Sequence, residues 1–194
     1  MPFLIYVHGF NSSEKSYKSQ QVKQRMEALG LGEHFACPRL PWQPAEAIAE
    51  LSDFIEQRLA EGHEVALVGS SLGGFYATYL GECFQLSVVL VNPAVEAPKL
   101  LRHYLGPQHN PYTDEGYVLA ERHMGQLEAI DIAAPETSRT WLMVQEQDEV
   151  LDYRAALRRY PTPAKLTREQ GGDHSFVNFD RFIDEILRFS GFSV

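Results

Sequence analysis

The stretch EVALVGSSLGG, residues 64–74, decides the fold. Its first half, ending at Val68, is a short apolar run typical of a buried strand, and the residues after it predict a helix. A serine between a strand and a helix, with glycine two residues away on each side, is typical of a tight turn that presents a nucleophile. We therefore take Ser71 as the candidate nucleophile, with Gly69 and Gly73 as the residues that permit the turn.

Short apolar runs alternate with amphipathic stretches on both sides of this turn, which predicts a mostly parallel sheet with helices on both faces. The expected strands cover residues 3–7, 35–39, 64–68, 86–91, 140–144 and 164–167. The expected helices cover residues 16–29, 44–60, 75–80, 153–160 and 176–189. The alternation lapses between 94 and 138, where two short helices are expected at 99–105 and 118–127. We expect one domain over residues 1–194, with 94–138 as an insertion or lid within it.

The composition is that of an ordinary globular protein, because 44% of the 194 residues are hydrophobic and 22% are charged. Lys and Arg number 17 against 26 Asp and Glu, a net charge of −9, which argues against a nucleic-acid partner. The acidity is concentrated in residues 101–150, which hold nine acidic and three basic side chains. If these acids face the mouth of a site, they should disfavour strongly anionic substrates.

The cysteine pattern and the first expected strand indicate where in the cell the protein is expected to reside. Cys37 and Cys83 are too few for a disulfide framework and lack metal or redox spacing, so a reducing cytosol fits best. The apolar run at 3–7 is too short to cross a membrane and has no basic flank, so we read it as a strand and expect no membrane insertion. The sequence does not determine the oligomeric state.

A serine nucleophile needs a base, and the base needs an orienting acid. Asp148 follows the expected strand at 140–144, and His174 follows the expected strand at 164–167. Both therefore lie at the carboxyl ends of parallel strands, where such sheets assemble their sites. The sequence thus predicts a triad of Ser71, His174 and Asp148.

Other residues compete for some of these roles. Glu146, Glu149 and Asp152 are close enough to Asp148 to be the acid instead, although Asp152 suits a helix N-cap. His8 is read as structural, because its place in a turn explains it and the base is expected later in the chain. The remaining histidines show no metal-ligand spacing, so no metal site is expected and surface or loop roles suffice for them.

The end of the first strand supplies a further part of the predicted site. In His8-Gly9-Phe10-Asn11 the glycine allows a sharp turn that leaves the backbone N–H of Phe10 free to point toward the serine. Together with the N–H of Leu72 it would form a two-donor oxyanion hole.

Five motifs together resemble the α/β-hydrolase fold family over nearly the whole chain, and more narrowly the small bacterial esterases of the YqiA and YcfP type. The motifs are YVHGFNSS at 6–13, LVGSSLGGFYATYL at 67–80, VNPAV at 91–95, QDEVLDY at 147–153 and GGDHSF at 171–176. The resemblance implies a three-layer α/β fold that lacks the leading N-terminal strands of larger members. It also implies a serine hydrolase with Ser71 as nucleophile, Asp148 as acid and His174 as base.

The expected activity is hydrolysis of small carboxylic esters or acyl thioesters through an acyl-enzyme, with a small-molecule substrate and no metal or organic cofactor. Amide or carbon–carbon bond hydrolysis on the same triad is an alternative. A non-catalytic binding module on a hydrolase scaffold is the alternative from another class. Tyr104, Leu105, Tyr112, Tyr117 and Met124 are expected to line an acyl pocket if residues 94–138 form a lid.

Overall fold

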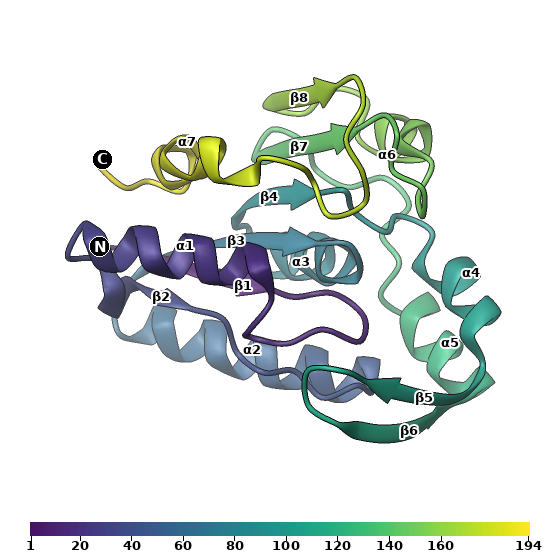
Figure 1. Ribbon diagram of the computed structural model, residues 1–194. Coiled ribbons are helices and arrows are strands. Elements are labelled where there is room, and N and C mark those ends of the chain that lie inside the picture. Colours follow the sequence, from purple (N-terminus) through teal and green to yellow (C-terminus); the bar gives the residue numbers. More distant parts are fainter.

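The computed structural model describes all 194 residues and contains the predicted mostly parallel sheet with helices on both faces (Figure 1). The six strands lie in the order β2-β1-β3-β4-β7-β8, and every neighbouring pair is parallel. Their bounds are β1 Pro2–Val7, β2 Phe35–Ala36, β3 Glu64–Ser70, β4 Ser87–Val91, β7 Thr140–Gln145 and β8 Lys165–Glu169. Because all six strands run the same way, their carboxyl ends share one edge, where the candidate site lies.

Successive side chains of the strands serve two separate cores, one on each face of the sheet. In β1, Leu4 and Tyr6 pack on one face, while Ile5 packs on the other. The first face is covered by α1 (Tyr17–Ala28) and α7 (Ile183–Phe189). The second is covered by α2 (Pro44–Ala60), α3 (Leu72–Phe84) and α6 (Tyr153–Arg159). No helix of the structure combines the length and the apolar character needed to cross a membrane.

Residues 94–138 contain a β-hairpin that the sequence analysis did not predict. Two helical turns, α4 (Ala97–Leu101) and η2 (Arg102–Tyr104), lead into β5 (Gly106–Asn110) and β6 (Glu115–Leu119), and α5 (Glu121–Glu128) follows. The helix expected from 118 therefore begins three residues late, because Val118 and Leu119 belong to β6. Strand β5 was not predicted because it begins with Gly106 and Pro107, and both residue types are uncommon in strand interiors.

Two other expected elements are shorter than predicted. The strand expected over 35–39 is a two-residue edge strand that follows the 3₁₀ turn η1 (Gly32–His34). The last helix begins late, because Phe176 and Asn178 adopt left-handed backbone conformations, with φ of 64° and 58°, that no helix can include. A 3₁₀ segment, η3 (Phe179–Phe182), then leads into α7.

Candidate active site

Ser71 occupies the turn between β3 and α3 in a strained conformation, with φ 55° and ψ −121°. The backbone on each side holds it there. Its N–H donates to the Val91 carbonyl at 3.1 Å, and its own carbonyl accepts from Gly74 at 2.9 Å and Ala94 at 3.0 Å. Strain that the surroundings enforce in this way is typical of a functional position.

The two glycines of the motif are required by close backbone approaches. A Cβ atom on Gly73 would lie 1.9 Å from the Val7 carbonyl oxygen, and one on Gly69 would lie 2.4 Å from the Gly73 carbonyl oxygen. Neither position has room for a side chain, so α3 can begin directly against the end of β1. The turn thus brings Ser71 to the carboxyl edge of the sheet.

We expect Gly73→Ala to destabilise the protein by about 3 kcal/mol, because the new methyl group meets rigid backbone and forces the helix away from β1. Urea denaturation measures the change. Gly125→Ala is the matched control, since a Cβ on Gly125 meets nothing within 4 Å and alanine favours α5 by about 1 kcal/mol. Equal midpoints for the two variants would contradict the packing argument.

The structure brings the three residues of the predicted triad together. His174 Nε2 lies 3.0 Å from Ser71 Oγ, and His174 Nδ1 lies 2.9 Å from Asp148 Oδ2. With the Nδ1 proton donated to the carboxylate, Nε2 is free to accept the serine proton. The contact chain therefore has the order and lengths that general-base activation of a hydroxyl requires.

Asp148 is fixed by its own turn. Its side chain is only 2% exposed, and Oδ1 accepts backbone N–H groups from Val150 at 2.9 Å and Leu151 at 2.8 Å. One carboxylate oxygen is thus held by the loop, which leaves the other for His174.

The three alternative acids have other partners. Glu146 pairs with Arg168 at 2.6 Å, and Asp152 caps α6 by accepting from the Arg154 N–H at 3.0 Å. Glu149 accepts the backbone N–H of His174 at 3.0 Å and does not contact the imidazole. Among these acids, only Asp148 contacts the ring of the histidine.

Two buried amides hold the loop that carries His174, and sequence reasoning missed both. Asn92 directly follows β4, and its Nδ2 donates to the carbonyls of Asp173 at 3.0 Å and His174 at 3.3 Å. Gln145 ends β7, and its Oε1 accepts the N–H groups of Asp173 at 3.2 Å and Val177 at 2.8 Å. The Asn-Pro pair after β4 was a visible signal, but nothing near Gln145 marked it out.

The first strand ends beside the turn that holds Ser71. A Cβ on Gly9 would lie 3.2 Å from Ser71 Cβ and 3.8 Å from the Leu72 nitrogen, so the turn packs directly on the serine. The Phe10 N–H has no acceptor within the protein, and the Leu72 N–H, first in its helix, has none within α3. The phenylalanine ring packs edge-on against Tyr104, with centroids 5.7 Å apart.

The β5–β6 hairpin holds the segment that contains Phe10 through two hydrogen bonds. Asn11, with φ 47°, accepts the Tyr117 hydroxyl at 2.6 Å, and the Asn110 amide donates to the Ser12 carbonyl at 2.9 Å. The hairpin within residues 94–138 therefore helps to fix the loop after β1. In Figure 1 the hairpin lies beside this loop, away from α7.

Two other histidines, His8 and His123, have structural partners. Burial lowers the pKa of His8, whose Nε2 accepts the Leu40 N–H at 3.2 Å and whose Nδ1 lies 3.1 Å from the Gly9 carbonyl. His123 is buried rather than at the surface as expected. Its ring accepts the Ala120 N–H at 2.9 Å at the start of α5 and packs edge-on against Trp42.

Ser71 and His174 open into a cleft of about 410 Å³. Phe10, Tyr17, Lys18 and Tyr112 are among its lining residues. Of the residues expected to form an acyl pocket, only Tyr112 lines this cleft. Met124 is wholly buried in the core, and Tyr117 stacks on Trp42 with ring centroids 4.3 Å apart.

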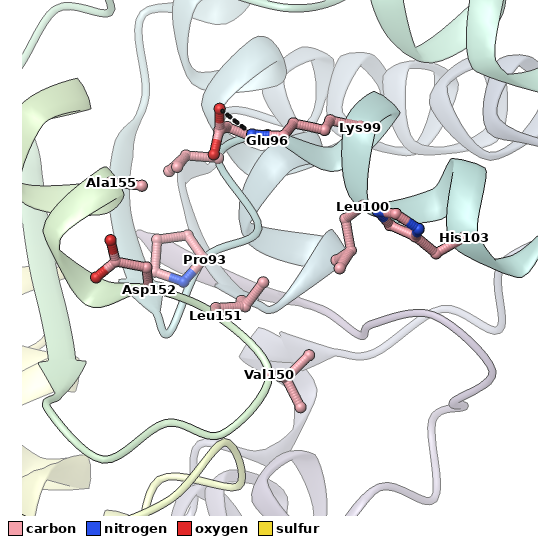
Figure 2. Close-up of a pocket in the computed structure, with 10 residues that line it drawn as sticks. Pro93, Glu96, Lys99, Leu100, His103, Val150, Leu151, Asp152 and Ala155 are labelled. Carbon is pink, nitrogen blue, oxygen red and sulfur yellow. Dashed lines mark ion pairs between the residues drawn. The ribbon is translucent and has the colours of Figure 1, made fainter.

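A second hollow of about 160 Å³ lies between α4 and α6, and Figure 2 shows its lining side chains. Its apolar members are Pro93, Val95, Leu100, Val150, Leu151 and Ala155. The hollow borders the site on two sides. Ala94, which lies between two of its lining residues, donates its N–H to the Ser71 carbonyl, and the lining residue Leu151 donates its N–H to Asp148. Glu96 and Lys99 pair with each other at its rim, as the dashed line in Figure 2 marks.

Four of the nine acids in residues 101–150 pair with arginines away from the cleft. Arg102 contacts both Glu121 and Glu128, and Arg159 contacts Asp131 at 2.6 Å. Glu149 is the one acidic residue of the 101–150 block that lines the cleft. The local charge of the cleft therefore differs from the net charge of the segment.

The six-stranded parallel sheet with helices on both faces is the α/β-hydrolase fold, which several solved hydrolase structures share. Over residues 3–191 the chain matches the family described as "Uncharacterised protein family (UPF0227)", and it belongs to that family.

Several solved structures share the fold at low sequence identity. A candidate hydrolase from Agrobacterium vitis S4 is 19% identical, with a TM-score of 0.78 over 97% of this chain and 87% of that one. Est1E from Butyrivibrio proteoclasticus, solved with ferulic acid bound, is 16% identical, with a TM-score of 0.70 over 97% and 87% of the two chains. A monoacylglycerol lipase from Paleococcus ferrophilus is 17% identical, with a TM-score of 0.63 over 97% and 93%.

Proposed function

We propose that the protein is a serine hydrolase that cleaves small carboxylic esters or acyl thioesters. The observation that carries the proposal is the unbroken contact chain from Ser71 Oγ through the His174 imidazole to Asp148, at 3.0 and 2.9 Å. Esterase and lipase names among proteins of the same fold agree with this choice of reaction. No metal or organic cofactor enters the proposed chemistry.

In the first half-reaction His174 Nε2 takes the proton of Ser71 as its oxygen attacks the ester carbonyl. The carbonyl oxygen gains a negative charge, which the N–H groups of Phe10 and Leu72 stabilise, at about 3 kcal/mol per donor. The tetrahedral intermediate collapses as His174 returns the proton to the leaving alcohol or thiol, and Ser71 is left acylated. Asp148 keeps the imidazole in the required tautomer and stabilises its charged form.

In the second half-reaction water replaces the alcohol. His174 removes a proton from the water, the hydroxide adds to the acyl carbon, and the same two N–H groups stabilise the new oxyanion. Collapse releases the carboxylic acid and restores the Ser71 hydroxyl. The apolar hollow between α4 and α6 suits the hydrocarbon part of a short ester. The hairpin suits a lid that also keeps the loop containing Phe10 in place.

Turnover of 4-nitrophenyl esters from acetate to dodecanoate tests the proposal, with butyryl thioester and 4-nitroanilide counterparts run in parallel. We expect steady hydrolysis of the short esters and covalent modification by a fluorophosphonate at Ser71, located by peptide mass spectrometry. Faster cleavage of the anilide would favour the amidase alternative. No turnover and no labelling would favour a non-catalytic binding module.

A further inference from the structure

The cleft that contains Ser71 and His174 also contains one lysine, Lys18, that has no ion-pair partner. Three other lysines of the chain have a carboxylate within ion-pair distance, namely Lys23, Lys99 and Lys165. Lys18 is half-buried, and its ammonium makes a single hydrogen bond, to the Ser175 carbonyl at 2.6 Å. Two of its three N–H groups therefore have no acceptor within the protein.

The carboxylates around Lys18 are already engaged. Asp148 binds His174 and two backbone N–H groups, and Asp173 accepts the Ser175 hydroxyl. Glu149, across the same cleft, accepts the backbone N–H of His174. The first turn of α1, which carries Lys18, contains no acidic side chain.

This position is costly for a cation. Burial lowers the pKa of Lys18 to about 8, and the carboxylates of Asp173 and Asp148 offset only part of that effect. An ammonium that loses water without gaining a counter-ion is destabilised until an anion arrives. Lys18 lies beside the residue that follows His174, so an anion bound to it would lie close to the reacting ester.

We propose that Lys18 binds a carboxylate of the substrate, so that the preferred substrates are esters that carry a second, ionised carboxyl group. The inference rests on the proposed esterase function and adds the substrate class. It differs from the expectation that the acidic middle of the chain repels anions, because Glu149 is the only one of those nine acids that lines the cleft. Four of the others pair with arginines outside it.

A purely structural role for Lys18 makes a different prediction. If its bond to the Ser175 carbonyl only steadied the loop of His174, removal of the ammonium would slow every ester equally. If it binds substrate, removal would affect only esters that carry the anion. The two roles are separated by comparing neutral and anionic esters of matched shape.

Two substrate pairs make the comparison: 4-nitrophenyl hexanoate with mono-4-nitrophenyl adipate, and phenyl butyrate with 4-carboxyphenyl butyrate. We expect the wild type to prefer the anionic member of at least one pair. Lys18→Met should lower kcat/KM for that member about 10-fold to 100-fold, mainly through KM, the loss expected for one charged hydrogen bond. Its rate on the neutral partner should stay within about threefold, and Lys18→Arg should retain the preference.

The pH dependence gives a second readout. In the wild type, the ratio of kcat/KM for the anionic ester to that for its neutral partner should fall as the pH rises through about 8, because Lys18 loses its proton. The other charged or ionisable groups near Lys18 are His174, Asp148, Asp173 and Glu149, and the ratio cancels any effect that they have equally on both esters. Lys18→Arg should remove the fall, because a guanidinium stays charged.

Hydrolysis of the neutral esters without any preference that depends on Lys18 would overturn the inference and leave the esterase function standing. An equal loss on both members of each pair in Lys18→Met would overturn it in favour of loop support. If the wild type hydrolyses none of the four esters, the proposed function fails and the inference fails with it. Unchanged urea midpoints of the variants establish that the kinetic differences do not arise from unfolding.

Discussion

Ser71→Ala is expected to lower kcat for 4-nitrophenyl butyrate on the order of 10⁶-fold, leaving only the rate that the oxyanion donors and substrate binding supply. The reason is chemical rather than structural. Alanine keeps the backbone bonds that hold the turn, to Val91, Gly74 and Ala94, but it has no oxygen to attack the carbonyl. Stopped assays at high enzyme concentration measure the residual rate, and circular dichroism checks the fold.

Ser70→Ala is the matched control for this variant. It removes a neighbouring hydroxyl of the same turn, which contacts the Tyr6 hydroxyl rather than His174. We expect Ser70→Ala to lower kcat less than about tenfold, because Ser70 takes no part in the proposed chemistry. Equal rates for wild type and Ser71→Ala would overturn the serine mechanism, and a larger loss in Ser70→Ala would reassign the nucleophile.

Asp148→Asn should reduce kcat about 10⁴-fold, with a smaller effect on KM. The amide oxygen can still accept the N–H groups of Val150 and Leu151, so the turn survives. Its NH₂ group then faces His174 Nδ1, which can only accept from it, and the Nε2 proton that results blocks transfer from Ser71. Steady-state kinetics on the short esters give the size of the loss.

Asp152→Asn provides the comparison for the acid. Asp152 lies four residues further along, is about half exposed and caps α6. Asparagine is an equally good cap, so both stability and kcat should change little. A large loss of kcat in Asp152→Asn alone would move the acid of the triad to that position.

The central sheet was predictable because its four inner strands, β1, β3, β4 and β7, are buried on both faces and are nearly continuous apolar runs between helical stretches. The positions of Ser71, Asp148 and His174 were predictable for a related reason: each follows a strand, and parallel strands end at one edge. The spacing of these residues along the chain carried no further information about their contacts.

Other features depend on contacts that no local pattern reveals. Asn92 and Gln145 act through hydrogen bonds to the backbone of a loop that is distant in the sequence. The residues next to them in the sequence indicate only that a strand ends there. The β5–β6 hairpin is held by its contacts with Asn11 and Ser12 rather than by strand propensity. The isolated charge of Lys18 is likewise visible only when its neighbours in space are known.

The stacking of Trp42 on Tyr117 also gives the protein an optical reporter. The chain has only two tryptophans, and Trp141 lies in the sheet, fully buried and far along the chain from the hairpin. In a Trp141→Phe background, all indole fluorescence would come from Trp42, whose ring contacts both the hairpin residue Tyr117 and His123 of α5. Its emission would therefore follow the position of the hairpin during turnover, without any attached dye.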